Sequence, residues 1–496
     1  MNNNKKIDIL IIGAGPAGLT AGYQLTKKSN LTTVILEEDK NYVGGISRTE
    51  IYKGYHFDIG GHRFFSKSQE VIKLWKEILP NDLLRRPRKS RIYYKNKFYN
   101  YPLRAFEALF NLGIFQSFLC IISYIKARIF PKKNPKNFQE WVSNKFGARL
   151  FKIFFKSYTE KVWGMKCNEI SANWASQRIK DLNMFTVIFS AIKNTLNISS
   201  TYTPTTLIKS FYYPRKGPGM LWEEAAKKIK MKDGQIIMGS KVVNLQYLET
   251  NEWIVSYKKD NKIYEIIATH VISSMPIKDL MISLVPKTSS IKFANNLKYR
   301  DFISVALIIK KKDIFDDNWI YIHDPNVFVG RIQNYKVWSE EMIPDNSTTC
   351  LGLEFFCNEG DDFWNKSNEQ LLEISSKELE YLNLVDKNDI IDGCVVRQKK
   401  AYPVYDAQYQ DDVDEIKKEI KKKYTNIHLI GRNGMHKYNN QDHAMMTALL
   451  TVENILRKKE VFDIWNVNEE AEYIEAGYPG AIDALQSIRN TPKKIY

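Results

Sequence analysis

The feature that most constrains this chain is a glycine-rich turn between two apolar runs close to the N-terminus. Within residues 7–38, an apolar run ends at Gly13, a helical pattern follows, and a second apolar run ends in acidic residues. Gly13 permits a tight turn, Gly15 lets backbone N–H groups approach a pyrophosphate, and Gly18 lets the helix pack closely on the strand. Glu37 lies 24 residues after Gly13, where a carboxylate accepts hydrogen bonds from ribose hydroxyls. This strand–turn–helix context predicts a dinucleotide-binding β-α-β unit.

The composition is that of a globular protein with two or three domains, apart from its charge. The chain has 496 residues, 44% of them hydrophobic and 26% charged, and its net charge is +17. A phosphorylated substrate, an anionic membrane surface or nucleic acid would each suit such an excess of positive charge. The sequence contains no zinc-finger, helix-turn-helix or RNP pattern. We therefore expect no nucleic-acid partner, and the first two explanations stay open.

The sequence shows no pattern of a disulfide-rich, metal-binding or membrane-spanning protein. Its five cysteines are scattered without a CxxC pair, which suits a reducing compartment. The most apolar stretch, residues 106–130, is interrupted by Asn111, Gln116 and Ser117, so it reads as a buried or amphipathic helix rather than a transmembrane one. We expect a cytoplasmic protein without a metal site. The basic residues after this stretch make peripheral membrane contact an alternative.

Two further pairs of glycines lie where a ligand would meet such a fold. The pair at 44–45, followed by Ser47, comes just after the second strand of the β-α-β unit. This is the carboxyl end of the sheet, where ligands bind in α/β folds. The pair at 60–61 directly precedes His62. A lone histidine is usually a packing residue, but the two glycines before it predict a position near the cofactor.

The rest of the chain divides into helical and β segments. A hairpin at 91–99 with its turn at Lys95-Asn96 opens a mainly helical region that continues to about residue 199, and residues 300–356 alternate as strands do. Late in the chain, a strand at 428–430 leads into Gly431-Arg432 and then into a helix at 444–456. A second strand, glycine turn and helix indicates that the two ends of the chain form one interleaved domain.

Seven short motifs stand out along the chain: GAGPAGL (13–19), FDIGGHRFFS (57–66), YTEKVW (158–163), WASQR (174–178), VGRIQNY (329–335), YP (402–403) and NQDH (440–443). Together they resemble the UDP-galactopyranose mutase family, its eukaryotic-type members most of all, within the amine-oxidase-like and glutathione-reductase-like flavoproteins. GAGPAGL indicates only a flavin dinucleotide, whereas YTEKVW, the glycine–histidine loop at 57–66 and NQDH are more particular.

The resemblance implies an α/β fold in which a Rossmann-like FAD-binding domain of the glutathione-reductase type carries a helical insertion and an antiparallel β-sheet substrate domain. We expect the FAD-binding domain at residues 1–90, 201–285 and 401–462, the insertion at 91–200, the substrate domain at 286–400 and a tail at 463–496.

The resemblance also implies that FAD acts in its reduced form, with flavin N5 as the nucleophile in the isomerisation of a UDP-sugar. An external reductant or NAD(P)H would keep it reduced; no second GxGxxG appears, so a dedicated nicotinamide domain is not expected. The expected FAD-binding residues are Gly13, Gly15, Ala17, Gly18, Glu37, Glu38, Gly45, Ser47, Gly61, His62, Val243, Gly431, Arg432, Asn440 and Gln441.

For the substrate, the resemblance implies that residues of this chain match an arginine pair that binds the diphosphate, several aromatic residues, and a histidine beside the flavin. Two arginines can neutralise a departing diphosphate by offering it planar forks of N–H donors. The expected catalytic residues are His62, Arg178, Arg331, Tyr335 and Tyr402, and the expected substrate-binding residues are Tyr158, Trp163, Arg178, Arg331, Tyr335, Tyr402 and His436.

The chain departs from the family at His436, where eukaryotic-type mutases carry a tyrosine four residues before NQDH. The sugar is therefore not determined by the resemblance.

A second hypothesis is an FAD-dependent oxidoreductase of the amine-oxidase type that acts on an amine, a polyisoprenoid or a lipid-linked sugar. A third is a flavin-binding protein that has lost its chemistry.

Overall fold

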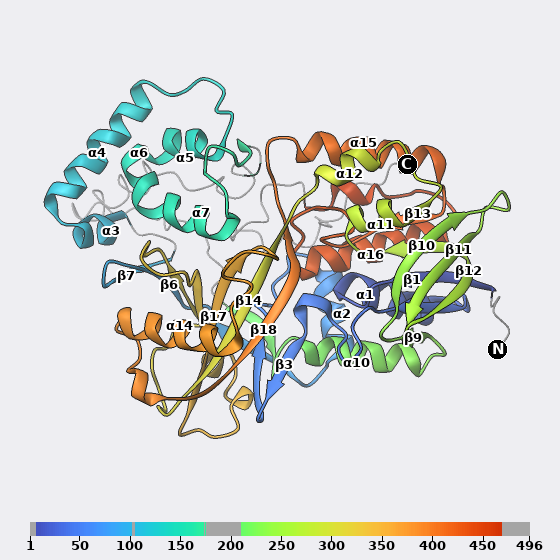
Figure 1. Ribbon diagram of the computed structural model, residues 1–496, viewed down its shortest axis with the longest axis horizontal. Coiled ribbons are helices and arrows are strands. Elements are labelled where there is room, and N and C mark those ends of the chain that lie inside the picture. Colours follow the sequence, from blue (N-terminus) through green and yellow to red (C-terminus); the bar gives the residue numbers. More distant parts are fainter. Residues whose placement is uncertain (1–5, 102–104, 173, 175–209, 469–496) are drawn as a thin grey trace.

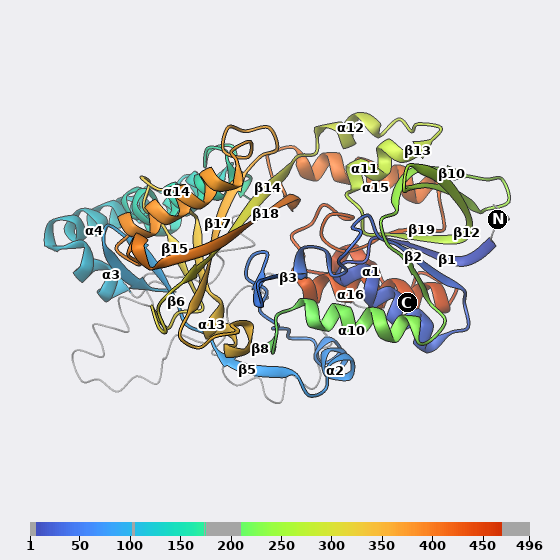
Figure 2. The ribbon, with the colours of Figure 1, turned by 60° about the horizontal axis from the view of Figure 1, so that its bottom comes forward.

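The computed structural model describes residues 6–101, 105–172, 174 and 210–468. Figure 1 shows a sheet with its covering helices in the right half of the molecule and a second sheet in the left half, with a group of helices at the upper left. Turned by 60° in Figure 2, the two sheets still lie side by side. The expected α/β fold is confirmed, and the second sheet is antiparallel apart from one parallel pair of strands.

The first sheet combines segments from the beginning, middle and end of the chain. Its strand order is β13-β10-β11-β12-β1-β2-β9, with β19 also paired with β12, and β1 runs parallel to both β2 and β12. The strands are β1 (Lys6–Ile12), β2 (Thr33–Leu36), β9 (Gln235–Ile237), β10 (Lys241–Tyr247), β11 (Trp253–Lys259), β12 (Lys262–Ser273), β13 (Leu284–Val285) and β19 (Ile427–Leu429). Ile9 and Leu10 point to opposite faces and both are fully buried, as expected where helices cover both faces of a parallel sheet.

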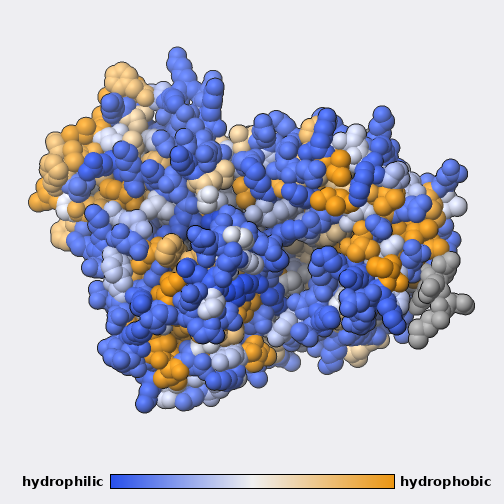
Figure 3. Space-filling view, viewed as in Figure 1, coloured by the Kyte–Doolittle hydropathy of each residue, from blue (hydrophilic) through white to orange (hydrophobic). Residues whose placement is uncertain are grey.

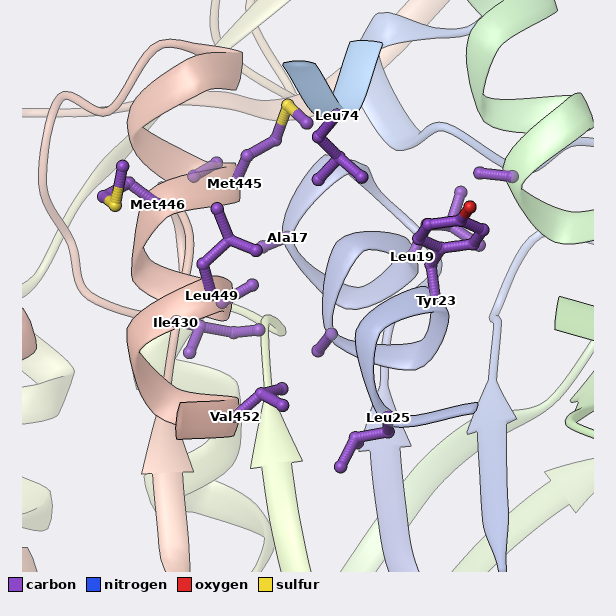
Figure 4. Close-up of a cluster of buried hydrophobic side chains, with 14 of the residues drawn as sticks. Ala17, Leu19, Tyr23, Leu25, Leu74, Ile430, Met445, Met446, Leu449 and Val452 are labelled. Atoms are coloured by element: carbon purple, nitrogen blue, oxygen red, sulfur yellow. The ribbon is translucent and has the colours of Figure 1, made fainter. Parts of the chain in front are cut away.

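The helices on one face of this sheet form its largest apolar core. These are α1 (Pro16–Lys28), α2 (Gln69–Ile78), α10 (Gly219–Lys230) and α16 (Gln441–Leu456). Figure 4 shows Ala17 and Leu25 of α1 facing the inward side chains of α16, among them Met445 and Leu449. Helix α16 begins three residues before the expected position because Asn440 caps it in a capping box. The other face is covered by α11 (Ile277–Ser283), α12 (Ile291–Asn296) and α15 (Tyr409–Lys423).

The second sheet has seven strands in the order β18-β14-β17-β16-β15-β6-β7, and α14 (Asn368–Tyr381) packs on it. Its strands are β6 (Ser90–Tyr94), β7 (Lys97–Asn100), β14 (Tyr299–Ile309), β15 (Trp319–Ile322), β16 (Arg331–Asn334), β17 (Thr349–Cys357) and β18 (Ile390–Pro403). The β6–β7 hairpin forms as predicted, but it does not belong to the helical insertion, where we expected it. Strand β6 instead pairs in parallel with β15, so the hairpin extends the second sheet.

Two small sheets connect these parts. They are β3 (Thr49–Tyr52) with β4 (Tyr55–Asp58), and β5 (Leu83–Pro87) with β8 (Ser210–Pro214). The helical insertion contains α3 (Ala105–Leu112), α4 (Ile114–Ile129), α5 (Phe138–Phe146), α6 (Ala148–Leu150), a π-helical turn (Phe151–Lys156) and α7 (Ser157–Trp163). The prediction of a single helix at 106–130 is wrong in one respect. The helix is broken into α3 and α4 at Gly113, whose φ of +84° favours glycine.

The C-terminal tail was expected at 463–496. Its described part, residues 463–468, packs on the core of the first domain, where Val467 is buried. The preceding Phe462 is also buried, and its backbone N–H donates to the side chain of Asn454. In the described residues, no helix is both long enough and apolar enough to cross a bilayer. The same part of the chain contains no cluster of potential metal ligands, and its five cysteines are free thiols.

Candidate functional site

The glycine turn before α1 forms an anion site made of backbone atoms. A Cβ atom added to Gly18 would lie 1.9 Å from the carbonyl oxygen of Gly13, so the helix can approach the turn only if this residue is glycine. Gly15 caps α1 without a side-chain hydrogen bond, and the first turn of the helix holds no acidic residue. The free N–H groups and the positive end of the helix dipole therefore suit a phosphate group.

A second strip of bare backbone faces this turn. The N–H of Gly44 donates to the carbonyl oxygen of Ala14 over 2.8 Å, and a Cβ added to Gly45 would lie 3.4 Å from the Cα of Gly15. Ser47 is buried in the same turn, where its N–H donates to Gly44. The two backbones thus lie close together with no side chain between them, which is the arrangement that a long, flat dinucleotide requires.

Glu37 lies at the glycine turn, whereas Glu38 lies on the surface. The Glu37 carboxylate accepts hydrogen bonds from the N–H of Ala14, over 2.5 Å, and from the N–H of Asp39, over 3.0 Å. Burial raises its pKa above the ordinary value. Glu38 is exposed and pairs with Lys241. Of the two acids, Glu37 has the position from which a carboxylate reaches ribose hydroxyls.

The expected residue Val243 lies in an irregular part of β10. The pairing of β10 with β11 shifts register between Val242 and Asn244, which leaves Val243 without a partner on β11. The start of this strand adjoins the acidic end of β2, because the N–H of Ser240 donates to the carbonyl oxygen of Glu37 over 2.7 Å. Such bulges free backbone groups for other partners.

The 60–62 loop is held from behind by a buried hydroxyl. Tyr335 is fully buried, and its hydroxyl donates to the carbonyl oxygen of Asp58 over 2.8 Å. Gly60 has a φ of +83°, and its carbonyl oxygen lies 3.0 Å from Nδ1 of His62. Tyr335 was expected to support the diphosphate. In this structure its hydroxyl supports the loop that carries His62.

His62 lies among three arginines. Burial, followed by the positive charges of Arg432, Arg331 and Arg48, lowers the pKa of His62 to about 3. Arg48 pairs with Glu50 over 2.7 Å, so its charge is compensated by a carboxylate. Because its pKa is so low, the imidazole of His62 is neutral at neutral pH. It lies close to the positive charges of these arginines.

Arg432 lies against two aromatic rings. Its guanidinium carbon is 5.1 Å from the ring centre of Tyr402 and 5.3 Å from that of Tyr438, and these two rings stack 6.0 Å apart at 17°. Its hydrogen bonds go to the carbonyl oxygens of Asn439 and Ala401. Among the described residues, Arg432 forms no salt bridge with a carboxylate, so its charge acts on the site.

Arg331 is held by a carboxylate on the neighbouring strand. Its Nε donates to Oε2 of Glu354 over 2.6 Å, and Nη2 contacts the same oxygen. Gln333 donates to the other oxygen of Glu354, and a Cβ added to Gly61 would lie 3.2 Å from the Gln333 amide. This network joins Arg331 to the glycine–histidine loop. The Nη1 atom of Arg331 makes no hydrogen bond within the described part of the chain.

Helix α7 brings aromatic residues to the same place. Tyr158 stacks on His323 with ring centres 4.7 Å apart, and the charges of Arg331 and Glu354 act on its hydroxyl. Trp163 packs edge-on against Tyr405 at 5.7 Å and lies 6.4 Å from Tyr438. The predicted residues Tyr158, Trp163, Arg331 and Tyr402 therefore converge with His62.

Helix α7 is held in place by a residue to which the sequence assigned no role. Arg300 is buried in β14 and donates to the carbonyl oxygens of Val162, over 3.1 Å, and Phe356, over 2.8 Å. A Cβ at Gly164 would lie 2.5 Å from the Arg300 guanidinium. A buried cation at a helix C-terminus is favoured by the dipole. The only sequence feature that could have indicated this role is the position of an arginine at the start of a strongly apolar strand.

The N-terminus of α16 closes the site beside the 60–62 loop. The Gln441 amide donates to the carbonyl oxygen of Arg63 over 3.1 Å, while its Oε1 is buried without a partner in the described residues. Gly431 has a φ of +80°, and a Cβ there would lie 3.0 Å from Cβ of Ala17. An unsatisfied buried acceptor and a bare glycine turn fit the polar edge of a bound ring system.

Two predicted substrate residues remain. Arg178 lies outside the described residues. His436 is almost fully buried, and its Nε2 lies 3.2 Å from the carbonyl oxygen of Val404. Its ring packs edge-on against Tyr299 and Tyr405. Tyr405 in turn contacts both Trp163 and Tyr438, so His436 lies one layer behind the rings that border the site.

Comparisons with known proteins indicate the family and the fold of the chain. Residues 16–456 match the model of the flavin-containing amine oxidoreductases. A probable UDP-galactopyranose mutase of Klebsiella pneumoniae is 24% identical over 185 residues, which are 34% of this chain and 44% of that protein. The match thus spans less than half the length of that relative.

Solved structures share the fold over nearly the whole chain. The structure of a reduced UDP-galactopyranose mutase has a TM-score of 0.79 at 19% identity and covers 94% of this chain and 98% of its own. A putative protoporphyrinogen oxidase from Exiguobacterium has a TM-score of 0.69 at 15% identity, covering 92% and 99%. A putrescine oxidase variant has a TM-score of 0.60 at 16% identity, covering 92% and 100%. The chain therefore belongs to the flavin-containing amine oxidoreductase family, and its cofactor is FAD.

Proposed function

We propose that this protein is a UDP-galactopyranose mutase-like isomerase, which interconverts the pyranose and furanose forms of a UDP-sugar for glycan synthesis. Bound reduced FAD would supply an electron-rich nitrogen that attacks the anomeric carbon of the sugar. The chain's own residues would bind the diphosphate, orient the sugar and keep water away. FAD fits the site because bare glycine backbone surrounds the α1 N-terminus and Glu37 lies beside it.

The observation that carries this proposal is the arrangement of Arg432 and Arg331 around His62, beside the aromatic residues of α7. Among the described residues Arg432 forms no salt bridge with a carboxylate, and Glu354 holds only one side of the Arg331 guanidinium. Two such cations suit an anionic ligand. A nucleoside diphosphate is such an anion, and it becomes more negative as the bond to the anomeric carbon breaks. The two arginines would therefore stabilise the transition state more than the bound ground state.

Arg331 is suited to bind the diphosphate directly. Glu354 occupies the Nε and Nη2 side of its guanidinium and so fixes its orientation, while Nη1 is left for a ligand. Burial holds the pKa of Tyr158 and of Tyr402 above the ordinary value. Both hydroxyls thus stay protonated and can donate to phosphate oxygens. Arg178, the second expected fork, remains a prediction.

The aromatic residues of α7 suit the nucleoside and the sugar. Flat rings such as those of Tyr158 and Trp163 bind bases and sugar faces by burying apolar area. Both lie within a few ångströms of other aromatic side chains, so their orientations are set before a substrate arrives. Preorganisation of this kind holds the anomeric carbon in one position and excludes water.

The other candidate is an oxidoreductase of the amine-oxidase type, which the family match itself favours. An amine substrate is cationic and would seek aromatic faces. Here Arg432 already lies 5.1 Å and 5.3 Å from the ring centres of Tyr402 and Tyr438, and a second cation beside it would be repelled. A lipid-linked anionic substrate meets no such objection. We therefore rank an anionic substrate above an amine.

The test is turnover of UDP-galactopyranose by the FAD-loaded enzyme after reduction with dithionite, followed by chromatography and NMR of the sugar nucleotide. The proposal expects a UDP-furanose in the reduced sample and none in the oxidised control. UDP-glucose and UDP-N-acetylgalactosamine, run in parallel, would define the sugar. No furanose from any of them, together with oxygen consumption on an amine or a prenyl lipid, would overturn the proposal in favour of the oxidoreductase.

A further inference from the structure

Helix α4 has two apolar faces, and the described part of the chain covers only one of them. Cys120 and Tyr124 are buried against the helices that follow. The approach is tight, because a Cβ at Gly147, between α5 and α6, would lie 2.8 Å from the backbone nitrogen of Tyr124. This face anchors α4 to the part of the insertion that leads into α7.

The second face is exposed along the whole helix. Ile114, Phe115 and Phe118 are 93%, 72% and 61% exposed. Most of the exposed apolar residues of α4 lie three or four positions from another, which puts them on one side of the helix. They are Ile114, Phe115, Phe118, Ile121, Ile122, Ile125 and Ile129. Figure 3 shows the corresponding hydrophobic surface at the upper left, where α3 and α4 lie. Isolated exposed apolar residues are common, whereas a contiguous face of this kind marks an interaction site.

The segment that carries this face has ionisable residues of one sign only. Residues 113–138 contain no aspartate or glutamate. They contain five basic residues, all with exposed side chains: Lys126, Arg128, Lys132, Lys133 and Lys136. Lys132 pairs with Glu140, which lies outside the segment. An apolar stripe with a basic flank is the pattern of a helix that lies in the surface of an anionic bilayer.

We propose that α4 docks this protein onto an anionic lipid bilayer, lying along the surface with its exposed face among the acyl chains. A second copy of the chain is a poorer occupant, because an apolar contact between two such faces would bring two basic flanks together. Spanning the bilayer is also disfavoured. The 16 residues of α4 reach about 24 Å, less than the hydrocarbon core of about 30 Å. This inference does not depend on the reaction proposed above.

Docking here would orient the active-site helix relative to the membrane. Helix α4 packs on α5 and α6, and the chain continues from α6 through the π-helical turn into α7, which carries Tyr158 and Trp163. The same insertion would thus contact the bilayer on one side and the substrate site on another. A sugar nucleotide or a lipid-linked acceptor would then be handled close to the membrane surface.

The experiment is co-sedimentation of the FAD-loaded full chain with phosphatidylcholine vesicles that do or do not contain about one third phosphatidylglycerol. Binding is expected only to the anionic vesicles and should weaken as salt is added. Phe115→Ser/Phe118→Ser should lower partitioning at least about tenfold, since two large apolar side chains no longer enter the bilayer. Met231, 75% exposed at the C-cap of α10, supplies the matched control, and Met231→Ser should bind as the parent does.

Two results would overturn the proposal. One is equal sedimentation of the parent and the double variant with anionic vesicles. The other is a concentration-dependent dimer, seen by analytical ultracentrifugation, that the double variant abolishes, because this would assign the face to a second copy. The unfolding midpoint of the double variant should match that of the parent, since both side chains are exposed. Turnover of a soluble UDP-sugar should also be unchanged, so a failure of the mutase proposal is detected separately.

Discussion

Arg331 and Glu354 lie directly opposite each other on β16 and β17, and their side chains form an ion pair beside the glycine–histidine loop. Arg331 retains some exposure, 18% of its side chain, whereas Glu354 has none. The pair is therefore asymmetric: the arginine faces the site and the carboxylate lies behind it. Because one partner is inaccessible, replacing the other leaves a buried charge without compensation.

The two roles of Arg331 can be separated by a pair of variants. Arg331→Gln alone should lose stability, by roughly 3–5 kcal/mol, because Glu354 is then buried without its partner. Arg331→Gln/Glu354→Gln should recover most of that stability, measured by urea unfolding. Turnover should stay low in both variants, reduced by roughly 2–5 kcal/mol of transition-state stabilisation. The flavin absorbance should persist in the double variant. Loss of FAD from a folded double variant would contradict a role in substrate binding.

The glycine turn offers a comparison between two alanine substitutions. At Gly18 the new Cβ would lie 1.9 Å from the carbonyl oxygen of Gly13, whereas at Gly15 its nearest neighbour is the Cα of Gly45 at 4.0 Å. Gly18→Ala should therefore fold poorly. Gly15→Ala should keep the stability of the apoprotein within about 1 kcal/mol but bind FAD at least tenfold more weakly. Thermal unfolding of the apoprotein and FAD titration measure the two effects. Equal FAD affinity in Gly15→Ala and the parent would show that the pyrophosphate does not approach this residue.

His62 should influence acid stability but not the pH dependence of turnover near neutrality. Its pKa is lowered from 6.5 to about 3 in the fold, so its contribution to stability is fully present above pH 6.5 and is lost as the pH falls towards 3. The stability difference between the parent and His62→Gln should change between these values and be constant above them. Other buried histidines titrate in both proteins and cancel in this difference. An inflection in turnover between pH 6 and 8 that disappears in His62→Gln would contradict a neutral imidazole.

Arg300 should act on the substrate site through helix α7. Its guanidinium donates to the carbonyl oxygens of Val162 and Phe356, and hydrogen bonds to a charged group contribute about 1.5–3 kcal/mol each. Arg300→Met should destabilise the protein by roughly 2–4 kcal/mol and raise the KM of the substrate, because Tyr158 and Trp163 lose their position. Arg300→Lys, which keeps the charge, should recover part of both effects. Arg300→Met with an unchanged KM would show that α7 is positioned without it.

Much of the first domain could be predicted from local patterns. The turn at Gly13, the helix after it and the second strand are specified within about 30 residues, and the structure confirms them. The β6–β7 hairpin was found for the same reason, since a two-residue turn specifies its own pairing. Its place in the fold was not found. Strand β6 pairs with β15, more than 200 residues later, and no local pattern encodes that partner.

The sequence by itself thus determined that a dinucleotide binds near the N-terminus and which short motifs surround it, because each depends on residues adjacent in the chain. Only the tertiary structure decided how those motifs meet. Glu354 behind Arg331, Arg300 at the end of α7 and Arg432 over Tyr402 and Tyr438 are contacts between distant segments, whose energies depend on burial and distance rather than on residue type. The exposed face of α4 belongs to the same class. The sequence predicted a buried or amphipathic helix at 106–130, but only packing shows which face of α4 the described part of the chain leaves uncovered.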